Sequence, residues 1–296
     1  RMDSPSSFLA PNGRLAARIP GWEPRPQQIV MADLVAAAID QKKHAIIEAG
    51  TGTGKSLAYL IPAVLAATAD QALQEECQPE KQQQTGHEDQ KPEKTNEKRP
   101  RRIVIATHTI ALQEQLVKKD IPVVSAVMPH EFSAVLVKGR GNYISLRRME
   151  LAKEREGSLF QYDEEVAELD GLLEWSGNTR DGSLADLPTI PRSSVWDEVH
   201  SDSGNCMGRT CPRYNDCHYF VARRRMNNAQ VLVVNHALFF SDLALRRSGV
   251  SLLPEYDIVI LDEAHMVESV ASDHLGVGLS SIAAERLLSR LYNERT

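Results

Sequence analysis

Short apolar runs that recur along the chain constrain its fold more than any other feature. They are residues 45–49, 103–107, 134–137, 231–234 and 258–261. Runs that are apolar at nearly every position suit strands covered on both faces, as in parallel sheets. Helical patterns follow the first two runs, over residues 57–67 and 110–117. This alternation predicts an α/β fold, with a doubly wound parallel sheet and helices on both faces.

Composition excludes several classes of protein. The chain has 296 residues, of which 42% are hydrophobic and 25% charged, so a sizeable core can form. No run approaches the roughly 18 apolar residues of a membrane span, and four cysteines are too few for a disulfide scaffold. The formal net charge of −6 gives no overall basic field, although it is compatible with a local basic groove. Since the chain also opens without the apolar core of a secretion signal, we expect a cytoplasmic protein whose cysteines are reduced or bind metal.

Two insertions interrupt the strand pattern. Residues 74–102 contain a single hydrophobic residue, Cys77, and predict a disordered polar insertion. The pattern also stops over residues 141–225, which predict a mainly helical inserted subdomain. The chain opens on Arg1 and ends directly after a helical pattern, so we expect a piece of a longer protein.

A glycine-rich loop follows the first apolar run. Its residues match the Walker A phosphate-binding pattern, with alanine where the strictest form has glycine; they are Ala49, Gly50, Thr51, Gly52, Thr53, Gly54, Lys55 and Ser56. The glycines let backbone N–H groups point at phosphate oxygens, Lys55 supplies a mobile charge for the β- and γ-phosphates, and Ser56 offers a hydroxyl to Mg²⁺. The alternative is a glycine-rich turn without function. The strand expected before the loop and the helix after it favour a nucleotide site.

An acidic box follows the last apolar run. Asp262 and Glu263 come directly after a buried strand, where one carboxylate can hold Mg²⁺ and the other can orient the attacking water. His265 is a candidate for linking hydrolysis to movement, because imidazole readily changes partners. The alternative is a strand end followed by a helix N-terminus, where acidic residues favour the helix dipole. The phosphate loop in the same predicted sheet favours a catalytic role, shared with Lys55.

Five stretches together resemble the DinG/XPD-like branch of superfamily 2 iron–sulfur helicases, nearer to its bacterial DinG members. They are residues 23–28, 48–56, 107–115, 233–238 and 261–265, within a resemblance that covers most of residues 20–280. It implies a RecA-like first motor domain over residues 20–140 and 226–268, preceded by an extension over residues 1–19. Residues 269–296 would begin an arch-type insertion.

The resemblance also implies roles for single residues. Arg25 and Gln28 would lie near the adenine of ATP, and Thr109 and Gln113 would face a track of single-stranded DNA. The alternatives are a helix N-cap for Thr109 and an exposed helix position for Gln113. Residues 235–236 belong to one of the matching stretches, and a plain strand-to-helix turn is their alternative.

Three cysteines with C-x4-C-x5-C spacing lie in the predicted inserted subdomain. Cys206, Cys211 and Cys217 are close enough in sequence to suggest a metal or cluster site. The resemblance implies a [4Fe–4S] cluster held by four cysteines, but Ser145 stands at the first of these positions. Three interpretations stay open: an iron–sulfur cluster, either labile on three cysteines or completed by Ser145 or another ligand; a zinc site that includes His218; and thiols without metal.

Basic residues flank the inserted subdomain, at Lys138, Arg140, Arg147–Arg148 and Arg223–Arg225. A local basic surface there would be the electrostatic footprint of DNA, with Arg147 and Arg148 as candidate contacts. The alternative is a solvated helix face.

These features predict an ATP-dependent DNA helicase that binds Mg²⁺-ATP between the loop and the acidic box. The resemblance implies 5′–3′ translocation on single-stranded or forked DNA, in repair or replication-conflict resolution in a bacterial, nucleoid-associated setting. It also implies a second RecA-like domain with an arginine finger. The residues after His265 are too few for such a domain, so we expect the chain alone not to unwind DNA. The rival interpretations are an ATPase switch that binds nucleic acid without unwinding it, and a redox- or metal-sensing module.

Overall fold

The computed structural model describes residues 4–76, 101–160 and 162–276, together with residues 281 and 288. At its centre lies a four-stranded sheet of order β2-β3-β1-β4, in which every pairing is parallel. The strands are β1 (Ile103–Thr107), β2 (Ala134–Leu136), β3 (Val231–Asn235) and β4 (Ile258–Leu261). Parallel register brings the carboxyl ends of β1, β3 and β4 to one edge of the sheet. The predicted α/β class is confirmed, and so are four of the five predicted strands.

Side chains of the strands alternate between two hydrophobic cores. Ile103 and Ile105 of β1 belong to one core, whereas Val104 and Ala106 belong to the other. All four are fully buried, because successive residues of a strand point to opposite faces and both faces are covered. This double burial explains why the strands are apolar at nearly every position.

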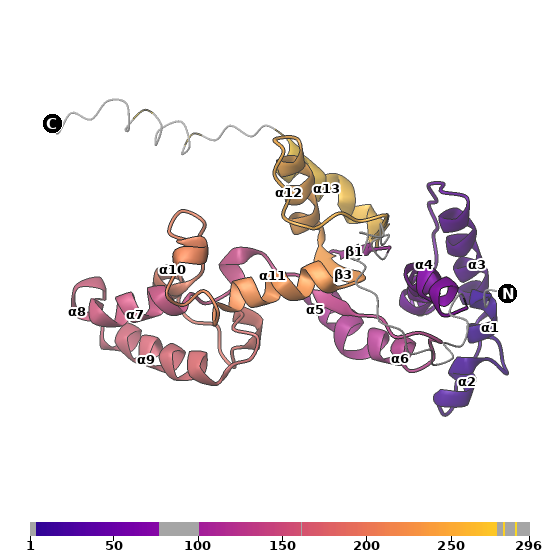
Figure 1. Ribbon diagram of the computed structural model, residues 1–296, viewed down its shortest axis with the longest axis horizontal. Helices are drawn as coiled ribbons and strands as arrows, with labels where there is room; N and C mark the ends of the chain where they lie inside the picture. Colours follow the sequence, from indigo (N-terminus) through magenta and orange to yellow (C-terminus); the bar gives the residue numbers. More distant parts are fainter. Residues whose placement is uncertain (1–3, 77–100, 161, 277–280, 282–287, 289–296) are drawn as a thin grey trace, which may run out of the picture.

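Helices from the first part of the chain share the first core with one face of the sheet, and α1–α4 group together in Figure 1. They are α1 (Pro5–Leu9), α2 (Arg14–Arg18), α3 (Pro26–Asp40), α4 (Lys55–Glu76) and α6 (Ile121–Ser125). Pro26 opens α3, where a fixed φ suits the first turn and the missing N–H costs no hydrogen bond. Leu60, Ile61 and Val64 of α4 are fully buried, so this helix anchors the phosphate loop that precedes it to the core.

The opposite face is covered by α11 (His218–Asn228), α12 (His236–Arg246) and α13 (Val267–Leu275). The carboxylate of Asp242 in α12 is fully buried, and the Arg246 guanidinium lies 2.7 Å from it. The N–H groups of Leu252 and Leu253 donate to the same carboxylate at 2.6 and 2.9 Å. A buried charge with several partners ties the segment before β4 to α12.

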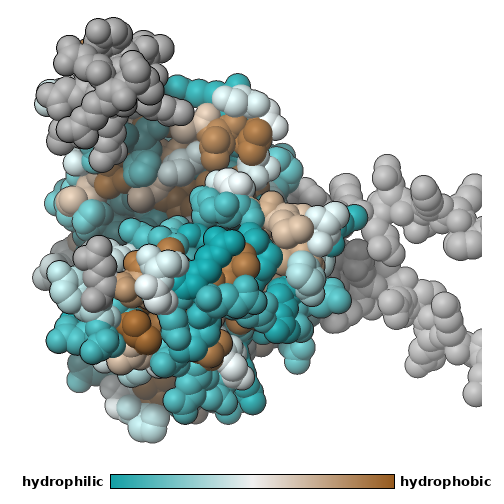
Figure 2. Space-filling view, turned by 90° about the vertical axis from the view of Figure 1, so that its left-hand side faces the viewer, coloured by the Kyte–Doolittle hydropathy of each residue, from teal (hydrophilic) through white to brown (hydrophobic). Residues whose placement is uncertain are grey.

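A third hydrophobic core lies in the segment between β2 and β3. Its helices are α7 (Leu146–Glu154), α8 (Glu156–Leu159), α9 (Asp163–Asn178) and α10 (Ser193–Val199). In Figure 1 they group at one end of the molecule, opposite α1–α4, and α11 leads back to the sheet. Figure 2 shows that the face at this end is mostly hydrophilic, with scattered hydrophobic side chains. Among the described residues of this core none is a cysteine, so apolar packing holds these helices together.

One predicted strand does not form, and that expectation was wrong. Residues 45–49 have no regular secondary structure, and Ile46 is fully exposed although Ile47 and Ala49 pack against the first core. A strand requires a hydrogen-bonded neighbour. In the described sheet β1 already has β3 and β4 at its two edges, and residues 45–49 pair with neither outer strand.

The other helix predictions hold with changed bounds. The helix expected over residues 57–67 lies within α4, and that over residues 110–117 is α5 (Ile110–Gln115) followed by a π-helical turn, η1 (Leu116–Asp120). Short 3₁₀ turns complete the described structure: η2 (Arg140–Asn142), η3 (Leu184–Asp186), η4 (Gly208–Thr210) and η5 (Ala264–Met266).

Parts of two predictions fall outside the described residues. They are residues 77–100, which include Cys77 and most of the expected polar insertion, and most of the stretch after Leu275 that was assigned to an arch. None of the described helices combines the length and apolar character that crossing a membrane takes.

Candidate functional site

The glycine-rich loop turns directly into α4. Gly52 and Gly54 have φ angles of 79° and 78°, in the left-handed region that residues with a Cβ rarely adopt. The Thr53 hydroxyl donates to the carbonyl oxygen of Gly50 at 2.9 Å and tightens the turn. Because the first N–H groups of a helix lack intrahelical partners, the loop and the start of α4 together suit an anion.

Two residues of the predicted nucleotide site brace this loop. The Arg25 guanidinium donates to the carbonyl oxygen of Gly52, and the Gln28 amide donates to that of Gly54 at 2.9 Å. Gln28 is buried, and a Cβ at residue 54 would lie 2.2 Å from its Nε2, so this packing requires glycine. The structure therefore brings Arg25 and Gln28 to the loop, and their contact with adenine stays a prediction.

The acidic box lies at the end of β4. The Asp262 N–H donates to the carbonyl oxygen of Ala106 at 2.8 Å and extends the β1–β4 ladder. Its carboxylate accepts a bond from the Glu263 N–H at 3.1 Å and another from the Tyr59 hydroxyl at 3.2 Å. Glu263 has a φ of 52°, which is uncommon for a residue with a side chain. Backbone strain of this kind concentrates at functional sites.

The loop and the acidic box meet through side chains. Lys55 Nζ lies 3.9 Å from Glu263 Oε1 and 3.4 Å from the carbonyl oxygen of Ala49. The side chains of Lys55 and Glu263 are each 30% exposed, so a ligand can reach both. His265 Nδ1 lies 3.4 Å from Glu263 Oε2 and is mostly exposed. Residues predicted from opposite ends of the chain thus form one site.

Burial controls ionisation at this site. Burial raises the pKa of Asp262 and the charge of Glu263 adds to the rise, while the Glu263 N–H, the Tyr59 hydroxyl and Lys55 offset part of it. Burial, and then the charge of Asp262, raises the pKa of Tyr59 well above 10.0, so its hydroxyl stays protonated and donates. Carboxylate and hydroxyl oxygens are hard donors of the kind that Mg²⁺ prefers. Ser56 and Asp262 therefore fit Mg²⁺.

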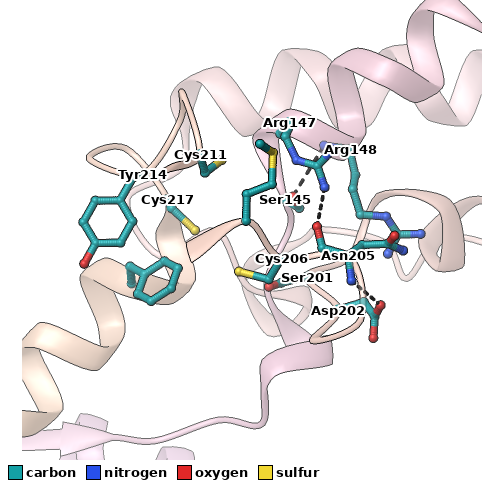
Figure 3. A pocket seen from close by; sticks show the side chains of 12 residues that line it. Ser145, Arg147, Arg148, Ser201, Asp202, Asn205, Cys206, Cys211, Tyr214 and Cys217 are labelled. Carbon is teal, nitrogen blue, oxygen red and sulfur yellow. Dashed lines mark hydrogen bonds between the residues drawn. The ribbon is translucent and has the colours of Figure 1, made fainter. Parts of the chain in front are cut away.

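The three cysteines line one hollow in the helical insertion, shown in Figure 3. Ser145, Arg147, Arg148, Ser201, Asp202, Asn205, Cys206, Met207, Cys211, Tyr214, Cys217 and Phe220 form its lining. The side chains of Cys206 and Cys217 point towards each other in this view, and all three thiols are free. Burial opposes ionisation of Cys206, but the Gly208 N–H and the Arg140 guanidinium lower its pKa overall.

Ser145 is the N-cap residue of α7. Its hydroxyl accepts a bond from the Arg148 N–H at 3.4 Å and caps α7. Among the residues that the structure describes, no three His, Cys, Asp or Glu side chains lie close enough together to hold a metal ion. The residues present therefore do not fit the four-cysteine arrangement, since the fourth donor is a hard hydroxyl engaged with backbone. His218, the candidate zinc ligand, packs against Gly182.

Arginine side chains hold the cysteine-bearing loop through its backbone. The Arg147 guanidinium donates to the carbonyl oxygen of Asn205 at 2.5 Å (Figure 3). The Arg148 guanidinium donates to the carbonyl oxygens of His200 and Asp197, both at 2.6 Å. The guanidinium groups of Arg147 and Arg148, which are the predicted DNA contacts, therefore already donate to backbone carbonyl groups. Contact of either arginine with DNA stays a prediction.

Comparison with known proteins agrees with this geometry. The DEAD/DEAH box helicase family matches residues 26–150, and the DEAD_2 family matches residues 205–283. The first match contains the phosphate loop and the second contains the acidic box. Both matched stretches are typical of DEAD/DEAH box helicases, to which the chain is related.

Its relatives include bacterial DNA helicases. The ATP-dependent DNA helicase YoaA of Escherichia coli is 36% identical over 275 residues, which are 92% of this chain and 38% of that protein. The ATP-dependent helicase DinG of Mycobacterium tuberculosis is 32% identical over 291 residues, 92% of this chain and 39% of that protein. The 3'-5' exonuclease DinG of Bacillus subtilis is 29% identical over 279 residues, 94% of this chain and 26% of that protein. This chain thus spans well under half the length of the curated relatives it matches.

Two of the predicted DNA residues lie at α5, Thr109 as its N-cap and Gln113 within it. Thr109 accepts a bond from the Leu112 N–H at 3.2 Å and caps the helix, so the N-cap alternative describes its local structure. Gln113 is 4% exposed, not the exposed helix residue of the alternative. Contact of either residue with DNA stays a prediction.

The strand-to-helix turn expected at residues 235–236 is present and contacts the acidic box. Asn235 caps α12, accepting a bond from the Leu238 N–H at 2.8 Å. His236 Nε2 lies 2.9 Å from the carbonyl oxygen of Asp262 and 3.2 Å from that of Ala106, so it donates to both strand ends. Burial lowers the pKa of His236, which keeps the ring neutral.

Two polar residues near the site, Tyr59 and Asp120, are not among those predicted from the sequence. Tyr59 lies one turn after Ser56 on the same face of α4, and this spacing from a predicted Mg²⁺ ligand was a usable clue. Asp120 is buried although two exposed lysines precede it in η1. No sequence pattern distinguishes it from a solvated charge.

Proposed function

We propose that this chain is the nucleotide-binding half of an ATP-dependent DNA helicase motor. The observation that carries the proposal is the approach of Lys55 Nζ to within 3.9 Å of Glu263 Oε1, which joins the phosphate loop to the acidic box. The names of the relatives YoaA and DinG supply the DNA helicase activity, and we extend that activity to the protein to which this chain belongs.

In this proposal each side chain has a separate task. Lys55 compensates the charge of the β- and γ-phosphates, and Ser56 and Asp262 hold Mg²⁺, which supplies further compensation when bound. Glu263 orients a water molecule and accepts its proton. Tyr59 fixes the Asp262 carboxylate through the 3.2 Å bond. His265, beside Glu263 and exposed, is placed to respond to a second domain.

The finer parts of the proposal come from the resemblance. They are 5′–3′ movement on single-stranded DNA and a second RecA-like domain that supplies an arginine finger. The chain by itself is therefore expected to bind nucleotide without separating strands. No step of the proposed mechanism passes through an iron–sulfur cluster, because Ser145 is engaged in capping α7.

The test is Lys55→Ala in the full-length helicase. Unwinding of a fluorescently labelled forked duplex should be abolished, because the phosphates lose their mobile cation. Lys43→Ala removes an exposed charge shortly before the loop and should leave the unwinding rate unchanged. Retained unwinding by Lys55→Ala would refute the proposed function.

A further inference from the structure

His236 is a buried histidine beside the acidic box that the proposed mechanism does not use. It is the first residue of α12, directly after β3, and is only 1% exposed. Its Nε2 atom lies 2.9 Å from the carbonyl oxygen of Asp262 and 3.2 Å from that of Ala106. Carbonyl oxygens only accept hydrogen bonds, so Nε2 carries the proton and donates to both. One imidazole thereby joins the carboxyl ends of β1, β3 and β4.

Local structure does not explain why this position holds a histidine. The side chain of Asn235 already caps α12. A residue that only filled the core would be apolar, whereas His236 leaves its Nδ1 atom buried without a hydrogen-bond partner among the described residues. Such an unpaired polar atom is costly and calls for an explanation. We look for it in the two bonds that the other ring nitrogen makes.

The shorter of these bonds holds a particular peptide unit. The carbonyl oxygen of Asp262 and the N–H of Glu263 belong to the same peptide. That N–H donates to the Asp262 carboxylate at 3.1 Å. A peptide unit is planar, so its C=O and its N–H turn together. With His236 at one end and the carboxylate at the other, the orientation of the unit is fixed from both sides.

This orientation bears on the backbone of Glu263, which is strained. Its φ of 52° lies in the left-handed region that a residue with a Cβ rarely adopts. Relaxation of φ would either carry the Glu263 side chain away from Lys55 Nζ, which lies 3.9 Å from it, or turn the peptide N–H away from the Asp262 carboxylate. Strained residues persist only where the surrounding contacts over-determine them. The bond from His236 is one of those contacts.

We propose that His236 is a positioning residue for Glu263: by donating to the carbonyl oxygen of Asp262, it holds the intervening peptide in the strained orientation in which Glu263 lies beside Lys55. The contact is made to the backbone, so it does not depend on a bound metal ion. The inference rests on the proposed function, in which Glu263 orients a water molecule and accepts its proton.

The test compares two amide substitutions in the full-length helicase. His236→Gln keeps an N–H donor at the distance of Nε2 from the backbone, whereas His236→Asn carries its amide at the distance of Nδ1 and falls short of the carbonyl oxygen. Phosphate release at saturating ATP should be about tenfold slower in His236→Asn, which loses a buried hydrogen bond, and within about threefold of wild type in His236→Gln. The affinity for a fluorescent ATP analogue should stay within about twofold of wild type in both variants, since the proposed role lies in hydrolysis and not in binding.

Two controls separate positioning from other effects. His274→Asn changes an exposed histidine of α13 and should leave the hydrolysis rate unchanged. His236→Asn is also combined with Glu263→Gln in a double-mutant cycle, measured in single turnovers. If His236 acts through Glu263, His236→Asn should change the remaining rate less than about twofold once residue 263 is glutamine.

The other outcomes count against the inference or against the function on which it rests. Equal rates for His236→Asn and His236→Gln would overturn the inference, whether both match wild type or both are reduced, because the donor at Nε2 would then make no difference. A parallel loss of affinity for the analogue in His236→Asn would overturn it too, since the histidine would then support the fold or the binding site. An undiminished effect in the Glu263→Gln background would have the same meaning. Wild-type hydrolysis by Glu263→Gln, or failure of the wild-type protein to bind the analogue, would instead refute the proposed function.

Discussion

The phosphate loop and the cysteine hollow are both assembled from residues far apart in the chain, but they differ in how much of each is in place. At the loop, Lys55 reaches Glu263, and Asp262 is fixed by its backbone neighbour and by Tyr59. In the hollow, three thiols face a serine whose hydroxyl caps α7, and arginines hold the surrounding loop by its carbonyl groups.

A site shaped by backbone geometry can form without its ligand, whereas a site made of metal-binding side chains depends on every one of those side chains. Glycines with positive φ, a helix N-terminus and strand ends at one edge shape the loop without a ligand. A four-thiolate site depends on four side chains of one chemical type, so a single oxygen in place of sulfur changes what it can hold.

The largest effect that would sharpen this comparison is expected at Glu263. Glu263→Gln keeps the size of the side chain but removes the proton acceptor. ATP hydrolysis by the full-length helicase, followed by phosphate release, should therefore fall about 10²- to 10⁴-fold while nucleotide binding is retained. Glu268→Gln, an exposed acid in α13, should change neither quantity. Hydrolysis within twofold of wild type would show that the loop lacks the catalytic group assigned to it.

The arginine bonds around the hollow are the next test. Arg148→Ala removes the bonds to His200 and Asp197 and should lower the free energy of unfolding of the chain by about 2 kcal/mol, since bonds to a charged donor are the stronger kind. The melting temperature should drop by about 4–8 °C.

Arg213→Ala is the matched control. Its guanidinium forms an exposed ion pair with Glu150, and its loss should leave the melting temperature unchanged. If Arg148→Ala melts at the same temperature as the wild-type chain, the arginine bonds do not stabilise the loop around the hollow. Its stability would then have to come from other groups, such as the three thiols.

A smaller effect is expected at Tyr59. Tyr59→Phe removes the hydroxyl that fixes the Asp262 carboxylate, so ATP hydrolysis should fall about three- to tenfold. Tyr162→Phe, which removes an exposed hydroxyl, serves as the control and should hydrolyse ATP at the wild-type rate. An equal rate for Tyr59→Phe would mean that the backbone alone positions Asp262.

The last prediction concerns the metal content of the hollow, where the substitution is expected to change neither ATP hydrolysis nor the fold of the sheet. The wild-type chain, purified without oxygen, should contain less than a full cluster, and Ser145→Cys should raise iron and acid-labile sulfide to about four of each per chain. Ser158→Cys adds an exposed thiol elsewhere in the same insertion and should leave both contents at the wild-type level. About four iron atoms in the wild-type chain would show that another group completes the ligand set and would remove the contrast between the two sites.

By itself the sequence determined the features that depend on neighbouring residues. The run 103–107 is β1 to the residue, since β-branched side chains buried on both faces favour a strand wherever partners exist. The glycine spacing predicted the loop because only glycine adopts its φ angles readily. The last apolar run is β4, and the predicted carboxylates Asp262 and Glu263 follow it directly at the carboxyl end of the strand.

Tertiary structure decided what depends on partners distant in sequence. Residues 45–49 have the composition of a strand, yet they form no ladder, because none of the four strands of the described sheet pairs with them although β2 and β4 each have an unpaired edge. Ser145 could be recognised as a missing ligand, but only the folded helix shows that its hydroxyl caps α7. Asp120 follows two exposed lysines and has the sequence pattern of a surface charge, yet it is buried at the end of the π-helical turn η1. Side-chain burial, strand pairing and hydrogen-bond partners depend on segments that are distant in sequence, so a local sequence pattern does not predict them.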